Sequence, residues 1–328
     1  PEELLNKYGG DSLRAYLIDS PVVRGEPLKF SEEGVKLVTR NIILPLWNSY
    51  SFFSTYANAD EITKGIDISN KTAIVTGGYS GIGLETTRAL VTAGAKVIIP
   101  AKRTEIACKN LEGIVPNEDI VEMNLENLNS VKKFTEDFKE NFKKLDLLIN
   151  NAGIMACPET RIGNGWESQF AVNHIGHFLL IKELMDTMAE NDSARFVSLS
   201  SSAHSLTGIL WDDIHFQNNP YDKWMAYGQS KTASSLIAIE FNRRMIDKGV
   251  SGFSVHPGGI LTPLQRHLQK EEMVALGWMD ENGSPSEMAK NFFKTTSQGA
   301  STTLWCATSS SLNGIGGVFC EDCDIAKR

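Results

Sequence analysis

Short apolar segments alternate with longer amphipathic ones from Lys71 onward. Apolar and β-branched runs predict strands at Thr72–Thr76, Lys96–Ile99, Ile120–Met123, Leu145–Asn150, Ala194–Leu199, Gly252–His256 and Gly317–Cys320. Helical patterns are expected to begin at Gly83, Ser130, Gly165, Tyr227 and Pro285. Several of the strand segments are almost wholly apolar, as in strands that helices cover on both faces. The alternation predicts an α/β fold with a doubly wound, Rossmann-type sheet of seven parallel strands.

The first 65 residues lack this alternation. Their apolar residues recur at helical spacing between Val35 and Tyr56. We therefore expect a small, mainly helical unit over residues 1–65, followed by the α/β domain over residues 66–328.

Composition and charge narrow the functional classes. A chain of 328 residues with 41% hydrophobic content can bury one large core and a smaller appendage. A net charge of −8 disfavours a nucleic-acid partner. No apolar run reaches the roughly 18 residues of a membrane span, and the start lacks a signal-peptide pattern.

The five cysteines are too few and too scattered for a disulfide framework, which fits a reducing, cytoplasmic location. Cys320 and Cys323 form a C-x-x-C pair, but a zinc site needs a second pair that this chain lacks. We expect no metal site and two ordinary thiols here, with a redox pair as the alternative.

A glycine-rich turn follows the first predicted strand. Thr76–Gly83 reads T-G-G-Y-S-G-I-G and continues into a helical pattern. Such glycines let backbone N–H groups and the positive end of a helix approach a pyrophosphate. The alternative is a glycine-rich loop without a ligand. A bound dinucleotide would contact Gly77, Tyr79, Ser80, Gly81, Ile82 and Gly83.

The end of the second predicted strand indicates which dinucleotide binds. An acidic residue there would bind the ribose 2′-hydroxyl of NAD, whereas a basic one would bind the 2′-phosphate of NADP. The strand is followed by Lys102 and Arg103, with no acid. NADP is therefore favoured over NAD, unless these two cations merely belong to a solvated loop.

A tyrosine and a lysine four residues apart supply candidate acid/base chemistry. In a helix, this spacing places Tyr227 and Lys231 on one face, where the ammonium would lower the pKa of the phenol. Alone, the pair is common on surface helices. Upstream, Ser200–Ser202 follow a predicted strand at the sheet edge where open α/β sheets bind ligands, so one hydroxyl could hold a substrate oxygen.

Residues 71–323 resemble the classical short-chain dehydrogenase/reductase family. Besides the glycine turn, Asn150–Gly153 matches its N-N-A-G motif, and Pro257–Thr262 matches its P-G-x-x-x-T motif. The resemblance implies a carbonyl or alcohol substrate and, as in many relatives, a homo-oligomer. It also implies that Ser201 orients the carbonyl and that Tyr227 exchanges the proton.

Further roles are implied by the same resemblance. Lys231 would also hold the nicotinamide ribose, and Asn173 would kink a helix and seat a water for proton relay. Tyr227 and Lys231 would thus be both catalytic and cofactor-binding residues. The remaining cofactor contacts implied by the family pattern are Asn124, Leu125, Asn151, Ala152, Gly153, Pro257, Gly258, Ile260 and Thr262. Asn124 stands where the family often has an aspartate.

An insertion separates Ser201 from Tyr227, which lie 26 positions apart, about twice the usual family distance. It runs from Leu206 to Met225 and resembles the branch that contains retinol dehydrogenase-like and WW-domain-oxidoreductase-like enzymes. The resemblance implies a hydrophobic substrate. Its aromatic residues either wall the substrate pocket or pack the insertion onto the domain: Trp211, Phe216, Tyr221 and Trp224.

The N-terminal unit resembles a different family. Tyr8–Arg14, Ser20–Gly25 and Leu44–Asn48 are similar to the segment of isoleucyl-tRNA synthetase just past its K-M-S-K-S loop. The resemblance implies a remnant or a fused fragment, with an accessory contact to tRNA as the alternative.

The sequence therefore predicts an NADP(H)-dependent oxidoreductase that uses Tyr227 as its acid/base. A non-catalytic dinucleotide sensor or scaffold is the alternative. Loss of Tyr227 or Lys231 would have favoured that alternative, and both are present.

Overall fold

A computed structural model of the protein describes residues 2–24, 30–190 and 193–326. The chain divides into two compact units, Pro1–Tyr56 and Ala57–Arg328. Across the described ranges, no helix combines the length and the apolar character that a membrane-spanning segment needs.

The first unit is helical. Its elements are α1 (Glu2–Ile18), η1 (Pro21–Arg24), α2 (Glu32–Val38), η2 (Thr39–Ile43) and α3 (Leu44–Tyr56). Gly9, with φ +78°, kinks α1, and the Ser31 side chain caps α2. Val35 and Val38 are buried, but other large apolar side chains of this unit, such as Ile18 and Leu46, are exposed. The expected helical segment is therefore present, with a small core.

The second unit is built on one eight-stranded sheet. Its strands are β1 (Thr72–Val75), β2 (Lys96–Ala101), β3 (Ile120–Glu122), β4 (Leu147–Asn150), β7 (Arg195–Leu199), β8 (Ser251–His256), β9 (Val318–Glu321) and β10 (Asp324–Ile325). They lie in the order β10-β9-β8-β7-β4-β1-β2-β3. The seven predicted strands are confirmed and parallel, in registers such as Ala73 opposite Leu147.

The sheet is larger than predicted because β10 adds an antiparallel edge strand beside β9. Asp322 and Cys323 both have positive φ and form the tight turn between the two strands. A separate hairpin pairs β5 (Arg161–Ile162) with β6 (Trp166–Glu167). Strands of two residues show no alternation that a sequence pattern could reveal.

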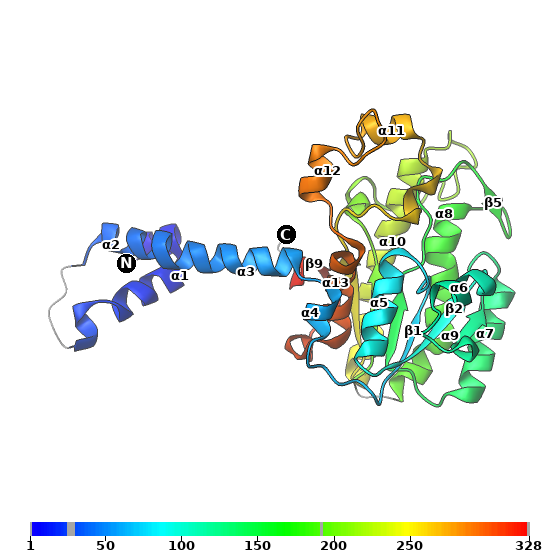
Figure 1. The fold of residues 1–328 in the computed structure, drawn as a ribbon, viewed down its shortest axis with the longest axis horizontal. Coiled ribbons are helices and arrows are strands. Elements are labelled where there is room, and N and C mark those ends of the chain that lie inside the picture. The colour runs from blue at the N-terminus through cyan, green and yellow to red at the C-terminus, as the bar shows by residue number, and fades with distance from the viewer. Residues whose placement is uncertain (1, 25–29, 191–192, 327–328) are drawn as a thin grey trace. The chain divides into compact units, whose positions relative to one another are not determined.

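Helices cover both faces of the sheet (Figure 1). On one face, α4 (Ala59–Thr63), α5 (Gly81–Thr92), α6 (Thr104–Asn110) and α13 (Thr296–Thr308) contribute to a core that includes Ile99 and Phe253. On the other face, α7 (Leu128–Asn141), α9 (His177–Ala189) and α10 (Lys223–Met245) enclose a core around Ile74 and Phe196. This arrangement confirms the doubly wound, Rossmann-type class.

Several helices begin away from their predicted starts because capping side chains set the first turn. The helix expected from Tyr227 begins at Lys223, where Asp222 accepts hydrogen bonds from two backbone N–H groups. The helix expected from Gly165 begins after β6 as α8 (Ser168–Phe170), which Glu167 caps. It continues through a π-helical turn, η4 (Ala171–Gly176), into α9.

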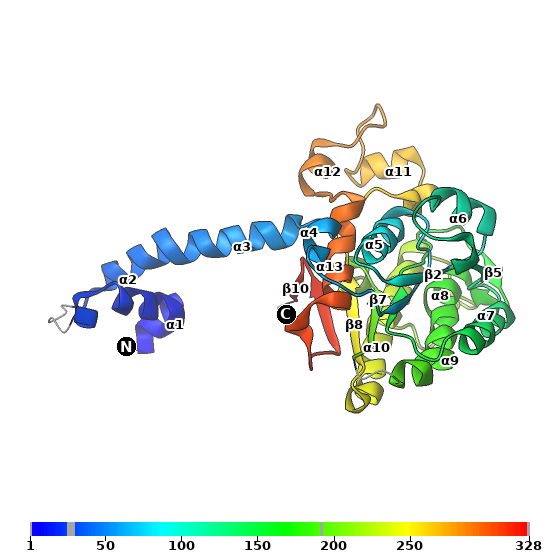
Figure 2. The ribbon, with the colours of Figure 1, turned by 60° about the horizontal axis from the view of Figure 1, so that its bottom comes forward.

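The segment between β8 and α13 forms a cap at one end of the sheet, and we call residues 263–293 the cap segment (Figure 2). It contains η7 (Pro263–His267), α11 (Lys270–Ala275) and α12 (Glu287–Phe292). The next residue, Lys294, is buried. Its backbone N–H donates to Gly259 O at 2.8 Å, and its ammonium pairs with Asp322. The remaining short turns are η3 (Asn117–Asp119), η5 (Ser202–Ser205), η6 (Ile246–Lys248) and η8 (Ser310–Leu312).

The unit boundary after Tyr56 lies earlier than the expected boundary after residue 65, because α4 packs into the second unit. Ala59 is fully buried, and its N–H donates to Ser297 Oγ on α13 at 3.2 Å. Asp60 pairs with Arg88 of α5 at 2.8 Å. These contacts make α4 part of the sheet's helical layer.

Two truncations test this boundary. Removing residues 1–56 should leave the melting temperature of the second unit within about 2 °C, whereas removing residues 1–65 should lower it by about 5 °C or more. The second deletion uncovers apolar surface and removes the Asp60 pair. Equal melting temperatures for the two truncated proteins, measured by calorimetry, would contradict this assignment of α4.

Candidate active site

Two adjoining cavities open where the strand order reverses, at the carboxyl ends of β1 and β4. In open α/β sheets this position is the usual ligand crevice. One cavity measures about 520 Å³ and the other about 410 Å³. They share six lining residues, and we call the combined space the cleft: Gly77, Tyr79, Arg103, Ala152, Gly153 and Arg266.

The glycine turn forms one wall of the cleft. Gly77 and Gly81 have φ of +63° and +55°, which favours glycine at both positions. A Cβ at Gly83 would overlap Gly77 O and the Asn151 amide, so a side chain there would push α5 away from the turn. The turn and the first N–H groups of α5 therefore form a cradle that fits a pyrophosphate.

A buried hydroxyl joins this turn to the N-N-A-G segment. Thr76 Oγ1 accepts hydrogen bonds from the N–H groups of Asn151 and Ala152, both at 2.9 Å. It also lies 2.9 Å from His177 Nε2 on α9. His177 Nδ1 lies 3.0 Å from Asn173 O. Because a carbonyl only accepts, the His177 proton belongs on Nδ1, and Nε2 accepts from the Thr76 hydroxyl.

Burial lowers the pKa of His177 to about 4, which keeps its ring neutral and preserves this arrangement at neutral pH. The sequence analysis missed His177. Its only sequence signal is the position four residues after Asn173, which places both residues on one face of the helix.

Asn173 lies in the π-helical turn and is buried, but it lines neither cavity. Its Oδ1 accepts from Ile154 N at 2.9 Å, and its Nδ2 donates to Ile154 O and to Ser230 Oγ, both at 2.9 Å. In this structure, Asn173 thus ties the segment after β4 to α10.

Ser201, Tyr227 and Lys231 line the larger cavity. Ser201 follows β7, and its side chain hydrogen-bonds that of Tyr227 on α10. Lys231 Nζ donates to Leu199 O at 2.9 Å and lies 5.6 Å from the centre of the Tyr227 ring. Of the neighbouring serines, Ser200 is buried and directs its hydroxyl to Lys231 O, which leaves Ser201 as the one beside Tyr227.

Burial shifts the pKa values of Tyr227 and Lys231 in opposite directions. It raises the pKa of Tyr227 to about 12, against which the Ser201 hydrogen bond acts in the lowering direction. It lowers the pKa of Lys231 to about 8. The net shift of the Tyr227 pKa is upward, opposite to the lowering expected from Lys231, because desolvation of the phenol is the largest cause. At neutral pH, Tyr227 holds its proton and Lys231 remains mostly charged.

The smaller cavity carries the predicted basic residues. Lys102 pairs with Glu126 at 2.6 Å, and both line the cavity beside Asn124 and Leu125. Arg103 lines both cavities, and no ion pair involves it in the described part of the chain. Glu126, an acid in this cavity, was missed by the sequence analysis because it lies two residues beyond Asn124 rather than at the end of β2.

Apolar side chains also line the larger cavity. Met155, Leu264, Trp278 and Phe293 line it, and the two aromatic rings pack edge to face with their centres 5.8 Å apart. Trp278 and Phe293 belong to the cap segment. Sequence reasoning missed both because that segment has no regular apolar period.

The insertion between Ser201 and Tyr227 mostly packs onto the domain. Trp211 is 76% exposed, and Phe216 is buried against Tyr221, whose hydroxyl donates to Cys157 O at 3.0 Å. None of the four predicted aromatic residues lines the cavity. Trp224 comes nearest to such a role, since it packs against Trp278. The idea that these four residues wall the pocket is therefore wrong.

The structure brings most of the predicted site residues to the cleft. Two predicted residues, Gly83 and Asn173, line neither cavity. Gly83 lets α5 pack closely against the glycine turn, and Asn173 hydrogen-bonds Ser230 of α10. The predicted residues that line one or both cavities are Gly77, Tyr79, Ser80, Gly81, Ile82, Lys102, Arg103, Asn124, Leu125, Asn151, Ala152, Gly153, Ser201, Tyr227, Lys231, Pro257, Gly258, Ile260 and Thr262.

Comparison with known families agrees with this geometry. The family model described as short chain dehydrogenase matches residues 71–273. The chain belongs to the short-chain dehydrogenase family. Its members are oxidoreductases that bind a nicotinamide dinucleotide, which fits the glycine cradle and the cleft.

Individual relatives match over most of the chain. A probable oxidoreductase of Streptomyces antibioticus is 40% identical over 266 residues, covering 78% of this chain and 86% of the relative. Retinol dehydrogenase 12 of Mus musculus is 36% identical over 266 residues, covering 80% of each chain. The solved structure of an uncharacterized Mycobacterium Paratuberculosis protein has a TM-score of 0.62 and 28% identity, covering 79% of this chain and 83% of that one.

The glycine cradle can be tested in this short-chain dehydrogenase by adding one methyl group. Gly83→Ala should weaken dinucleotide binding at least tenfold, because the Cβ displaces α5 from the turn. The control is Gly208→Ala, where no atom lies within 4 Å of the added Cβ. Fluorescence titration of both folded variants with NADPH measures the effect. Equal affinities would contradict the proposed cradle.

Proposed function

We propose that this chain is an NADP(H)-dependent oxidoreductase that transfers a hydride between nicotinamide and a hydrophobic carbonyl or alcohol substrate, with Tyr227 as its acid/base. The observation that carries the proposal is the convergence of Ser201, Tyr227 and Lys231 on the cavity that the glycine turn also lines. A scaffold that only bound a dinucleotide would need neither the phenol nor the ammonium at that point.

The bound dinucleotide supplies the hydride. Ser201 and Tyr227 hold the substrate oxygen between their hydroxyl groups, which fixes the carbonyl carbon over the cleft. As negative charge develops on that oxygen, Tyr227 transfers its proton to it. Lys231 stabilises the resulting phenolate, and its ammonium is held in place by Leu199 O. Oxidation of the alcohol runs through the same steps in reverse.

The choice of NADP rests on Arg103. Lys102 is partly neutralised by Glu126, whereas Arg103 forms no ion pair within the described residues. A guanidinium suits a phosphate because it offers paired N–H donors in one plane. Arg103 is therefore the residue expected to bind the 2′-phosphate, with NAD as the weaker cofactor.

The apolar side chains opposite Tyr227 support a hydrophobic substrate. Met155, Leu264, Trp278 and Phe293 offer dispersion contacts and few polar groups. They favour a substrate with a bulky aliphatic or aromatic part next to its carbonyl group.

We infer that residues 1–56, the first unit, take no part in this reaction and are a remnant or fusion of synthetase-like origin, whereas α4 belongs to the second unit. The family match begins at residue 71, which supports their separate origin. The five unpaired cysteines support a reducing, cytoplasmic location, and a homo-oligomer is the state expected from the family.

Replacing Tyr227 by phenylalanine tests the acid/base role. The variant should lose about 10² to 10⁴ in kcat on a panel of hydrophobic carbonyl compounds, while its affinity for NADPH stays within about threefold of the unchanged protein. Steady-state rates and NADPH titrations are the measurements. A fully active variant would refute the role of Tyr227. An unchanged protein that binds NADPH but turns over no substrate would establish the sensor alternative.

The pH dependence follows from Lys231. Because burial lowers its pKa to about 8, the ammonium is present below this value and is lost as pH rises through it. The rate constant kcat/KM for carbonyl reduction should therefore fall between about pH 7 and about pH 9.5. Tyr227, with its pKa raised to about 12, keeps its proton throughout. A flat profile over this interval would contradict a catalytic role for the charge on Lys231.

A further inference from the structure

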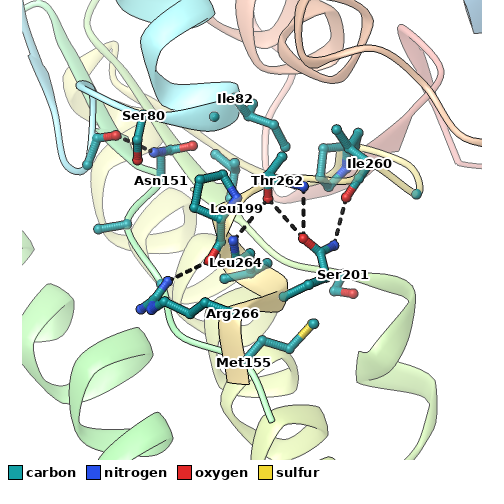
Figure 3. A pocket seen from close by; sticks show the side chains of 18 of the residues that line it. Ser80, Ile82, Asn151, Met155, Leu199, Ser201, Ile260, Thr262, Leu264 and Arg266 are labelled. Carbon is teal, nitrogen blue, oxygen red and sulfur yellow. Dashed lines mark hydrogen bonds between the residues drawn. The ribbon is translucent and has the colours of Figure 1, made fainter. Parts of the chain in front are cut away.

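The loop that follows β8 is braced before it reaches the cap segment. Thr262 N donates to Gln265 Oε1 at 2.8 Å, and Gln265 Nε2 donates to Ile260 O at 2.7 Å. Leu264 N donates to Thr262 Oγ1 at 3.2 Å. Figure 3 shows these bonds closing the loop on itself. The next residue, Arg266, is thus presented to the cleft from a preorganised turn.

Arg266 reaches across the cleft. It lines the larger cavity together with Thr262 and Leu264, and it also lines the smaller one together with Gly77 and Gly153. In Figure 3 its head group extends away from Ser201. The position therefore lies between the catalytic end and the Lys102 end of the cleft, alongside the glycine turn.

The guanidinium of Arg266 has N–H donors that form no hydrogen bond to the described residues. Within the described residues, its one hydrogen bond runs from Nη1 to Pro263 O at 2.9 Å, and no carboxylate pairs with it. A guanidinium carries five N–H donors and a full charge at any relevant pH. An exposed arginine that lines a cleft in this state can bind an anion.

The other cationic side chains of the cleft have other partners or lie elsewhere in it. Lys231 is held by Leu199 O beside Tyr227, and Lys102 pairs with Glu126. Arg103 stands near the end of β2, where a 2′-phosphate would lie. The end of α5 supplies only about half a positive charge, whereas a dinucleotide pyrophosphate carries about two negative charges. Like Arg103, Arg266 lines both cavities next to Gly77 of that turn, and it does so from the cap segment.

We propose that Arg266 is a phosphate-binding residue whose guanidinium pairs with the pyrophosphate of the bound dinucleotide, across the cleft from the N-terminus of α5. This inference rests on the proposed dinucleotide function. It adds a contact from the cap side of the cleft, where the loop of Thr262 already lies next to Gly81 of the glycine turn.

Titrations with NADPH and NADH test the proposal, because both carry the pyrophosphate and only NADPH carries the 2′-phosphate. Arg266→Gln should weaken both dinucleotides by a similar factor, about tenfold or more, and Arg266→Lys should recover part of the loss. Arg103→Gln should weaken NADPH alone. The matched control is Arg243→Gln, since Arg243 lies on α10, pairs with Glu240 and lines neither cavity. Melting temperatures check that each variant is folded.

Two results would overturn the assignment. If Arg266→Gln weakened NADPH but not NADH, the residue would bind the 2′-phosphate instead. If both affinities matched those of the Arg243 control, Arg266 would bind no phosphate. An unchanged protein that bound neither dinucleotide would instead overturn the proposed function itself, which distinguishes that failure from a failure of this inference alone.

Discussion

The hydroxyl of Thr76 is the junction on which the cleft depends. It accepts hydrogen bonds from two backbone N–H groups of the segment after β4 and donates one to His177 Nε2. His177 Nδ1 in turn donates to the backbone carbonyl of Asn173. Thr76, His177 and Asn173 are buried, so loss of a hydrogen bond between them would leave an unsatisfied polar atom. The junction fixes the end of β1 and the N-N-A-G segment against α9, and the Asn173 side chain extends it to α10 through Ser230. The glycine turn, Tyr227 and Lys231 are therefore held in position without a bound ligand.

Burial also sets the chemistry of the pair on α10. A fully solvated phenol and ammonium would keep ordinary pKa values, whereas burial here raises the pKa of Tyr227 to about 12 and lowers that of Lys231 to about 8. Tyr227 therefore keeps its proton at neutral pH, while Lys231 remains mostly charged. Apolar side chains from the cap segment line the same cavity.

The sequence predicted those features that local pattern controls. Strands such as β4 and β7 are continuous apolar runs, and Tyr227 and Lys231 are four positions apart on one helix. It did not predict features that depend on distant contacts. Trp278 and Arg266 reach the cleft only because the cap segment folds over it, while Phe216 and Tyr221 turn inward to hold the insertion. The pKa shift of Tyr227 was missed because spacing reveals a neighbouring charge but not the depth of burial.

We propose that one cleft aligns nicotinamide with Tyr227. A crystal structure of the protein with NADP⁺ would test this alignment directly. We expect the pyrophosphate to lie at the glycine turn, the adenine to lie near Leu125, and nicotinamide C4 and the Tyr227 hydroxyl both to face one substrate-sized space. A dinucleotide bound in the reverse direction, or with its nicotinamide outside the cavity of Ser201, Tyr227 and Lys231, would contradict it.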